Sequence, residues 1–236
     1  MTNPIYPCSA FTQVQHLPDA QDLAVLQCAA RFFVTKTAVA SALCACAMML
    51  CIGFSGATEA QTRLAAQQDR ISDATIAADY DSYKAMQSRI NQLNERGIPV
   101  RDYALSKAQC WLDVSLHEYT RNDRSDFPQA AFSESEKLIV TLERKHIPDT
   151  DTALVNGAVR LRPDLWERTA SLKQHSGFRC AWRQVACAEV ELVHAGNEHS
   201  QQQWRHSKPY VQIAEDLLSE ASAAVQSCSP PPAAVP

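Results

Sequence analysis

The apolar run from Thr37 to Phe54 constrains this chain more than any other stretch. No charged residue stands between Lys36 and Glu59. A helix over Thr37–Phe54 would be about 27 Å long, which is enough to cross the hydrocarbon core of a bilayer. We therefore interpret the run as an export signal or a membrane anchor, with a buried helix of a soluble domain as the alternative.

Residues 36–60 have the parts of a signal peptide. Arg31 and Lys36 provide a basic start, and small residues follow the apolar run. Small-x-Ala sequences end at Ala57 and Ala60, so we predict cleavage after one of these two residues. If the signal is retained instead, residues 37–54 are the membrane contact. Lipid attachment at Cys46 fits poorly, because apolar residues continue beyond it.

The apolar run lies further from the first residue than a signal peptide normally does. Residues 1–35 contain no basic cluster and only a weak helical pattern, and we leave them as an unassigned N-terminal extension. A start of translation near Val34 would place the signal at the N-terminus, where signals normally lie.

The cysteines beyond the run are consistent with an oxidising compartment, where disulfides persist. Cys110, Cys180, Cys187 and Cys228 are an even set and allow three connectivities. Cys180 and Cys187 lie near the start of one predicted helix, and we predict that they pair if the helix begins after Cys180. Cys110 would then pair with Cys228, or both would stay free.

Composition excludes two broad classes of function. The formal net charge is −4, and there is no clustered basic face for nucleic acid. The chain has only six glycines, and none forms a Gly-rich loop for phosphate. Plentiful Ala, Gln, Glu and Leu and the lack of alternating patterns favour an all-α fold.

Residues 61–226 are predicted to form about six amphipathic helices, arranged as packed αα-hairpins. The predicted helices cover 61–96, 101–121, a segment capped by Asp126 with Pro128 in its first turn, 163–174, 180–198 and a last helix that begins at Pro209. The stretch 146–162 is loop-like, and residues 227–236 form a Pro-rich tail.

The chain contains a weak internal sequence similarity, which we call the internal echo. "AQCWLDVSLHEY" followed by "AFSESEKLIVTL" resembles "VACAEVELVHAGNEH" followed by "VQIAEDLLSEA", at an offset of 77 to 80 residues. This pattern fits two αα-hairpins packed as a pair. The alternative is that amphipathic helices simply resemble one another.

No group of residues passes a test for catalysis or metal binding. His194, Glu198 and His199 stand in the wrong order for a shared zinc ion. Cys180, Cys187 and His194, or Cys110 with His117, are seven residues apart, which is about 10 Å along a continuous helix. We therefore predict no catalytic residue, no cofactor and no metal ligand.

Two long phrases carry a family resemblance. "YALSKAQCWLDVSLHEYTRNDRSDFPQAAFSESEKLI" and "LRPDLWERTASLKQHSGFRCAWRQVACAEVELVHAGNEHSQQQWRHSKPYVQIAEDLL" resemble the helical region that precedes the OmpA-like domain of some proteobacterial envelope proteins. The resemblance spans roughly residues 78–222. The peptidoglycan-binding domain of those proteins has no counterpart in this sequence, so neither that activity nor any functional residue is carried over.

The predicted signal indicates a periplasmic location and the resemblance implies a protein of the cell envelope, and we expect a helical scaffold or adaptor rather than an enzyme. Its expected partners are envelope proteins or the cell wall, with no nucleic acid. A membrane-anchored, wall-associated protein and a metal-dependent hydrolase are the alternatives.

Overall fold

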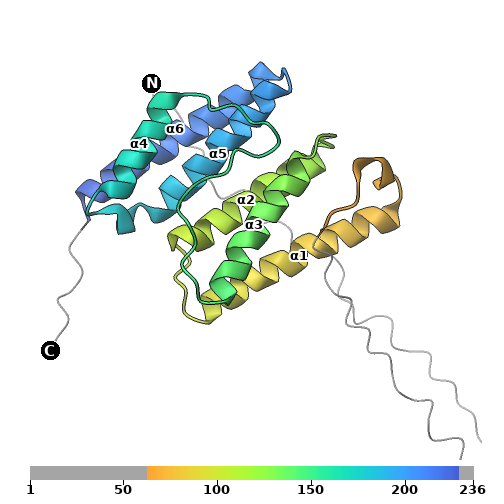
Figure 1. The fold of residues 1–236 in the computed structure, drawn as a ribbon, viewed down its shortest axis with the longest axis horizontal. Coiled ribbons are helices and arrows are strands. Elements are labelled where there is room, and N and C mark those ends of the chain that lie inside the picture. The colour runs from red at the N-terminus through yellow and green to blue at the C-terminus, as the bar shows by residue number, and fades with distance from the viewer. Residues whose placement is uncertain (1–62, 229–236) are drawn as a thin grey trace, which may run out of the picture. The chain divides into compact units, whose positions relative to one another are not determined.

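The computed structural model describes residues 63–228, which belong to one compact unit, Gly56–Pro236. These residues form six α-helices and two short 3-10 helices, with no strand among them, which confirms the predicted all-α class (Figure 1). The helices are α1 (Asp73–Glu95), α2 (Tyr103–Thr120), α3 (Phe127–Glu143), α4 (Pro163–Gln174), α5 (Trp182–Ser200) and α6 (Trp204–Gln226), with η1 (Gln67–Asp69) before α1 and η2 (Phe178–Cys180) before α5. The predicted signal, the N-terminal extension and residues 229–236 lie outside the described residues.

Helices α1, α2 and α3 form one group in which successive helices run antiparallel (Figure 1). The hydroxyls of Tyr83 on α1 and Ser115 on α2 lie 2.8 Å apart, and Tyr119 donates to Asp79 at 2.7 Å. Residue numbers therefore rise along α1 as they fall along α2. The Ser115 hydroxyl also lies 2.6 Å from the carbonyl of Pro128 and joins α2 to α3.

Helices α4, α5 and α6 form a second group. Helices α5 and α6 are joined through a short turn and form an antiparallel hairpin (Figure 1). Helix α4 lies beside α6 in the same direction, because Arg162 contacts Glu215 and Arg168 contacts Ser222. The paired hairpins predicted from the internal echo are thus α2 with α3 and α5 with α6.

The two groups meet along a seam between α2 and α5. Three contacts across this seam have nearly the same sequence separation: the disulfide Cys110–Cys187 (77), the hydrogen bond between Glu118 and His194 (76) and the hydrogen bond between Ser125 and Gln201 (76). A constant separation means that α2 and α5 run in the same direction, with equivalent positions of the echo facing each other.

The apolar stripes predicted from helical periodicity form the core. Leu105, Ala108 and Leu112 of α2 are buried, as are Val185 and Leu192 of α5. Among residues 63–228, no helix combines the length and the apolarity needed to cross a membrane.

Two predicted helix starts, those of α1 and α6, are wrong. Helix α1 begins only at Asp73, because the Ser72 side chain accepts the Thr75 amide and caps the helix there. The predicted start of α3 is confirmed, with Asp126 at the N-cap position and Pro128 in the first turn, although the Asp126 side chain makes no cap hydrogen bond. Pro209 lies inside α6, which begins five residues earlier at Trp204. Pro209 lies in the second turn of α6, and since proline has no backbone N–H, the Arg205 carbonyl lacks its helical donor there.

The loop between α3 and α4 packs closely on α5. The Val159 amide donates to the Gly196 carbonyl at 3.4 Å, and a Cβ atom at Gly196 would lie 2.1 Å from the Val159 carbonyl oxygen. Only glycine allows the two backbones to approach this far. Gly196 thus fixes the position of a segment without regular structure.

All four predicted disulfide candidates are disulfide-bonded, but the predicted pairing is wrong. Cys110 pairs with Cys187, and Cys180 pairs with Cys228, with Cα–Cα distances of 5.4 and 5.8 Å. Helix α5 does begin after Cys180, yet Cys187 lies in its second turn and faces α2. Since α5 and α6 are antiparallel, the start of α5 lies beside the end of α6, where Cys228 follows.

Non-reducing peptide mapping of the oxidised protein should recover Cys110–Cys187 and Cys180–Cys228 peptides. Because both bonds close long loops, replacing either pair by serines should lower the free energy of unfolding by about 2–5 kcal/mol. Urea unfolding followed by circular dichroism measures this loss. A peptide that joins Cys180 to Cys187 would contradict the arrangement.

Candidate functional site

A buried ionic network lies between α2, α5 and the loop before α4. Lys107 of α2 and Glu189 of α5 are both almost fully buried, with Nζ and Oε2 3.3 Å apart. The Lys107 ammonium also donates to the carbonyls of Thr150 and Asp151, at 3.1 and 2.9 Å. The network therefore joins the loop to the two central helices.

Glu189 is held as an anion by several donors. Tyr103 and Thr152 donate to its Oε2, and Lys173 forms an ion pair with its Oε1 at 2.7 Å. Burial by itself raises the pKa of Glu189, but Lys107 and Lys173 together hold the pKa below its usual value. The pKa of Lys107 is lowered by burial, which the Glu189 carboxylate opposes. Each charge in the network has a partner, so the pair can stay ionised without solvent.

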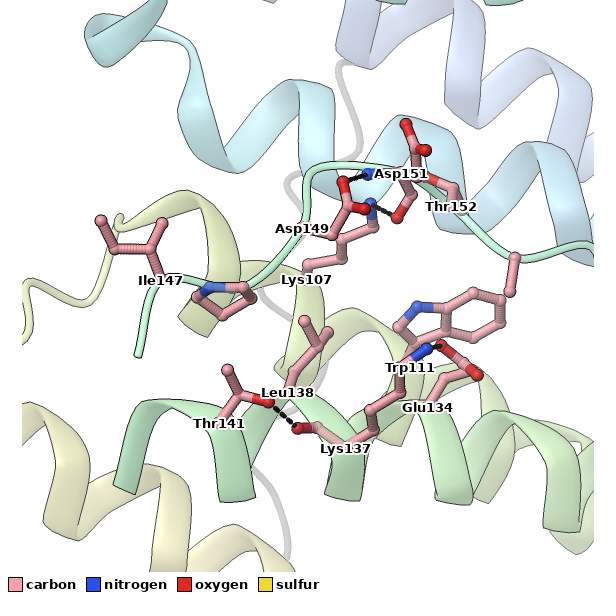
Figure 2. Close-up of a pocket in the computed structure, with 12 residues that line it drawn as sticks. Lys107, Trp111, Glu134, Lys137, Leu138, Thr141, Ile147, Asp149, Asp151 and Thr152 are labelled. Atoms are coloured by element: carbon pink, nitrogen blue, oxygen red, sulfur yellow. Dashed lines mark hydrogen bonds and ion pairs between the residues drawn. The ribbon is translucent and has the colours of Figure 1, made fainter. Parts of the chain in front are cut away.

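A pocket of about 280 Å³ opens beside this network, between α2, α3 and the loop (Figure 2). Lys107 and Trp111 line it from α2, and Leu138 lines it from α3. In Figure 2, Ile147 lies at the edge of the pocket and points away from it, and the side chain is 97% exposed. The pocket thus combines a buried cation and apolar walls with an exposed apolar residue at its rim.

A second polar group, which we call the imidazole–carboxylate cluster, consists of His117 and Glu118 of α2 and His194 of α5. His194 donates from Nε2 to Glu118 Oε1 at 2.8 Å, and His117 Nε2 lies 3.5 Å from the same oxygen. Glu118 and His194 are buried, whereas His117 lies at the surface. The rings of Phe127 and Tyr210 stack on His194, with centroids 5.5 and 3.7 Å away.

Hydrogen bonds set the charges in the cluster. Burial opposes protonation of His194, but bonds to Glu118 and Glu191 raise its pKa to about 9. Burial likewise raises the pKa of Glu118, but His194 and Arg121 reverse this effect and hold it below its usual value. The Arg121 guanidinium lies 3.1 Å from Glu118 Oε1. The buried pair is thus an imidazolium and a carboxylate.

Glu198 of α5 lies next to the cluster and is incompletely paired. The side chain is 1% exposed, and its Oε2 makes no hydrogen bond, although His206 Nδ1 lies 3.3 Å away. Burial raises the pKa of Glu198, and the nearby Glu118 raises it further. Glu118 also lines a polar pocket of about 290 Å³. Arg121, which contacts Glu118, lines the same pocket.

The sequence did not identify these groups as a site. His194 joins the cluster, whereas His199, its predicted neighbour in a discarded zinc set, is exposed. Cys110 is in a disulfide with Cys187 and offers no thiol that could act with His117. One signal was present: His117 follows Cys110 by seven residues, as His194 follows Cys187. A seam that joins the cysteines also joins the histidines two turns further on.

Comparison of the chain with protein-family models, with curated proteins and with solved structures finds no match in any of the three.

Replacing Lys107 by Met should destabilise the fold by about 3–5 kcal/mol, because Glu189 would lose a buried counter-charge. Lys84→Met is the matched control, since Lys84 forms an exposed ion pair with Asp81, and such pairs contribute about 0–1 kcal/mol. Urea unfolding of the oxidised proteins measures both losses. Equal effects of the two substitutions would show that the network contributes little.

Proposed function

We propose that this chain is an exported cell-envelope protein whose helical domain acts as a periplasmic scaffold or adaptor. The single observation that carries the proposal is the pair of disulfides, which engages every cysteine between residues 63 and 228. Disulfides of this kind persist in oxidising compartments such as the bacterial periplasm. The apolar run of residues 36–60 provides the export signal or anchor that such a location needs.

A role in binding is supported by the way the polar groups of the first pocket are used. The Lys107 ammonium is surrounded by Glu189, Tyr103 and two loop carbonyls, so its donors serve the fold. What the pocket offers a partner is its shape and the exposed side chain of Ile147 at its rim. A concave pocket with apolar walls is a common form of binding site.

Export can be tested with a fusion of residues 1–62 to alkaline phosphatase, which is active only after its own disulfides form outside the cytoplasm. We expect an active fusion, and a matched fusion without residues 36–57 should be inactive. The start codon should be fixed in both plasmids. An inactive full fusion that accumulates as protein would contradict the proposed location.

The adaptor role can be tested by placing a photo-reactive amino acid at Ile147 and irradiating intact cells. We expect a discrete cross-linked product with one envelope protein or with the cell wall, because this residue lies at the pocket rim. Ile71 is the control position, since it is equally apolar, 87% exposed and outside the pocket. The same products from both positions, or none from Ile147, would contradict a specific contact at this pocket.

A further inference from the structure

We infer that His117, Glu118 and His194 form a binding site for a divalent transition metal ion, with Zn²⁺ as the ion best suited to these ligands. Each residue offers one ligand atom, and the three atoms lie within 4.8 Å of one another. Two imidazoles and one carboxylate are a common ligand set for zinc and for non-haem iron. The proposal goes beyond the scaffold role and does not depend on it.

The distances from Glu118 to the two histidines are close to those that a zinc ion requires. With bonds of about 2.0–2.1 Å, two tetrahedral ligand atoms lie about 3.4 Å apart. Glu118 Oε1 lies 2.8 Å from His194 Nε2 and 3.5 Å from His117 Nε2. His117 is a surface residue, with 46% of its side chain exposed, so its ring can adjust without disturbing the core.

The surroundings orient His194 as a ligand. Glu191 lies 3.3 Å from His194 Nδ1 and can accept a hydrogen bond from this N–H group. His194 Nε2, which donates to Glu118 in the metal-free protein, would release its proton to solvent on binding the ion. A carboxylate behind a metal-bound histidine is the usual arrangement in zinc sites. Phe127 and Tyr210 stack on the imidazole and fix the plane of the ring.

A metal ion would have to displace the Arg121 guanidinium from Glu118, and also the Tyr210 hydroxyl, which lies 3.4 Å from Glu118 Oε1 and 3.0 Å from His117 Nε2. The guanidinium is partly exposed and lies 3.1 Å from Glu118 Oε1. Glu198 offers an alternative partner, because its buried Oε2 makes no hydrogen bond and the two side chains interact electrostatically. A buried carboxylate oxygen without a hydrogen bond costs free energy. Metal binding at Glu118 would let Arg121 turn to Glu198 and remove that cost.

The ion would join α2 to α5 at a second point on the seam. His117 and His194 are each seven residues beyond a cysteine of the Cys110–Cys187 disulfide, which is about 10 Å along the helices. The disulfide and the metal ion would therefore link the same two helices two turns apart.

The test is calorimetric titration of Zn²⁺ into the full chain, purified without a histidine tag and kept oxidised. Thiols that remain free, such as any among the cysteines of residues 1–62, should first be alkylated so that they do not bind zinc. We expect one Zn²⁺ per chain and a rise in the midpoint of thermal unfolding. With Co²⁺ as a second probe, we expect visible absorption bands typical of a site with nitrogen and oxygen ligands.

His117→Ala is the decisive variant, because His117 lies at the surface and its loss leaves the buried pair intact. The affinity for Zn²⁺ should fall about tenfold or more. His199→Ala is the matched control, since it removes an exposed histidine of α5 and should leave the affinity unchanged. No saturable binding by the unmodified chain, or equal affinity in His117→Ala and the unmodified chain, would overturn the site. An equal loss in His199→Ala would overturn it as well.

Discussion

The contact between α2 and α5 brings together the two groups of three helices. The Cys110–Cys187 disulfide sets the register of this seam. Because the two helices run in the same direction, facing residues keep nearly the same sequence separation along the seam. Every cross-seam pair that follows depends on this register, including Glu118 with His194 and Ser125 with Gln201. A shift of one residue would turn these side chains away from their partners, since neighbouring residues on a helix point about 100° apart.

The seam also explains why so many charged groups are buried in a helical domain of this size. Lys107 and Glu189 lie near one end of it and the imidazole–carboxylate cluster near the other. Taking such charges out of water is unfavourable unless each charge meets a partner. In the Lys107–Glu189 network the loop between α3 and α4 completes the set of partners, and Gly196 allows the loop to lie close enough to α5.

The two proposals draw on different features of the same seam. The scaffold role rests on the disulfides and on a pocket whose buried cation already serves the fold. The metal site rests on three ligand atoms that lie within 4.8 Å of one another, and Glu198 near them retains an oxygen without a hydrogen bond. A polar network that is complete stabilises a structure, whereas an incomplete one indicates a place where a ligand can bind.

The sequence by itself determined the local features of this protein. The spacing of Leu105, Ala108 and Leu112 was enough to predict a buried helical face, and Pro163 marked the start of α4 correctly. These predictions succeed because helical periodicity and proline geometry act within a few residues. The choice of Cys110, Cys180, Cys187 and Cys228 as disulfide candidates was also correct, because it required only their even number and their position beyond the apolar run.

Only the tertiary structure decided which faces meet. The pairing of Cys110 with Cys187, and the meeting of His117 with His194, join residues 77 positions apart. No local pattern specifies such a contact, since each helix offers several faces that could pack against several others. The internal echo aligns Cys110 with Cys187 and His117 with His194. This alignment indicates a contact only when α2 and α5 are known to lie parallel. The direction and register of two packed helices are properties of the whole core, and they placed the charges, the disulfide and the cluster together.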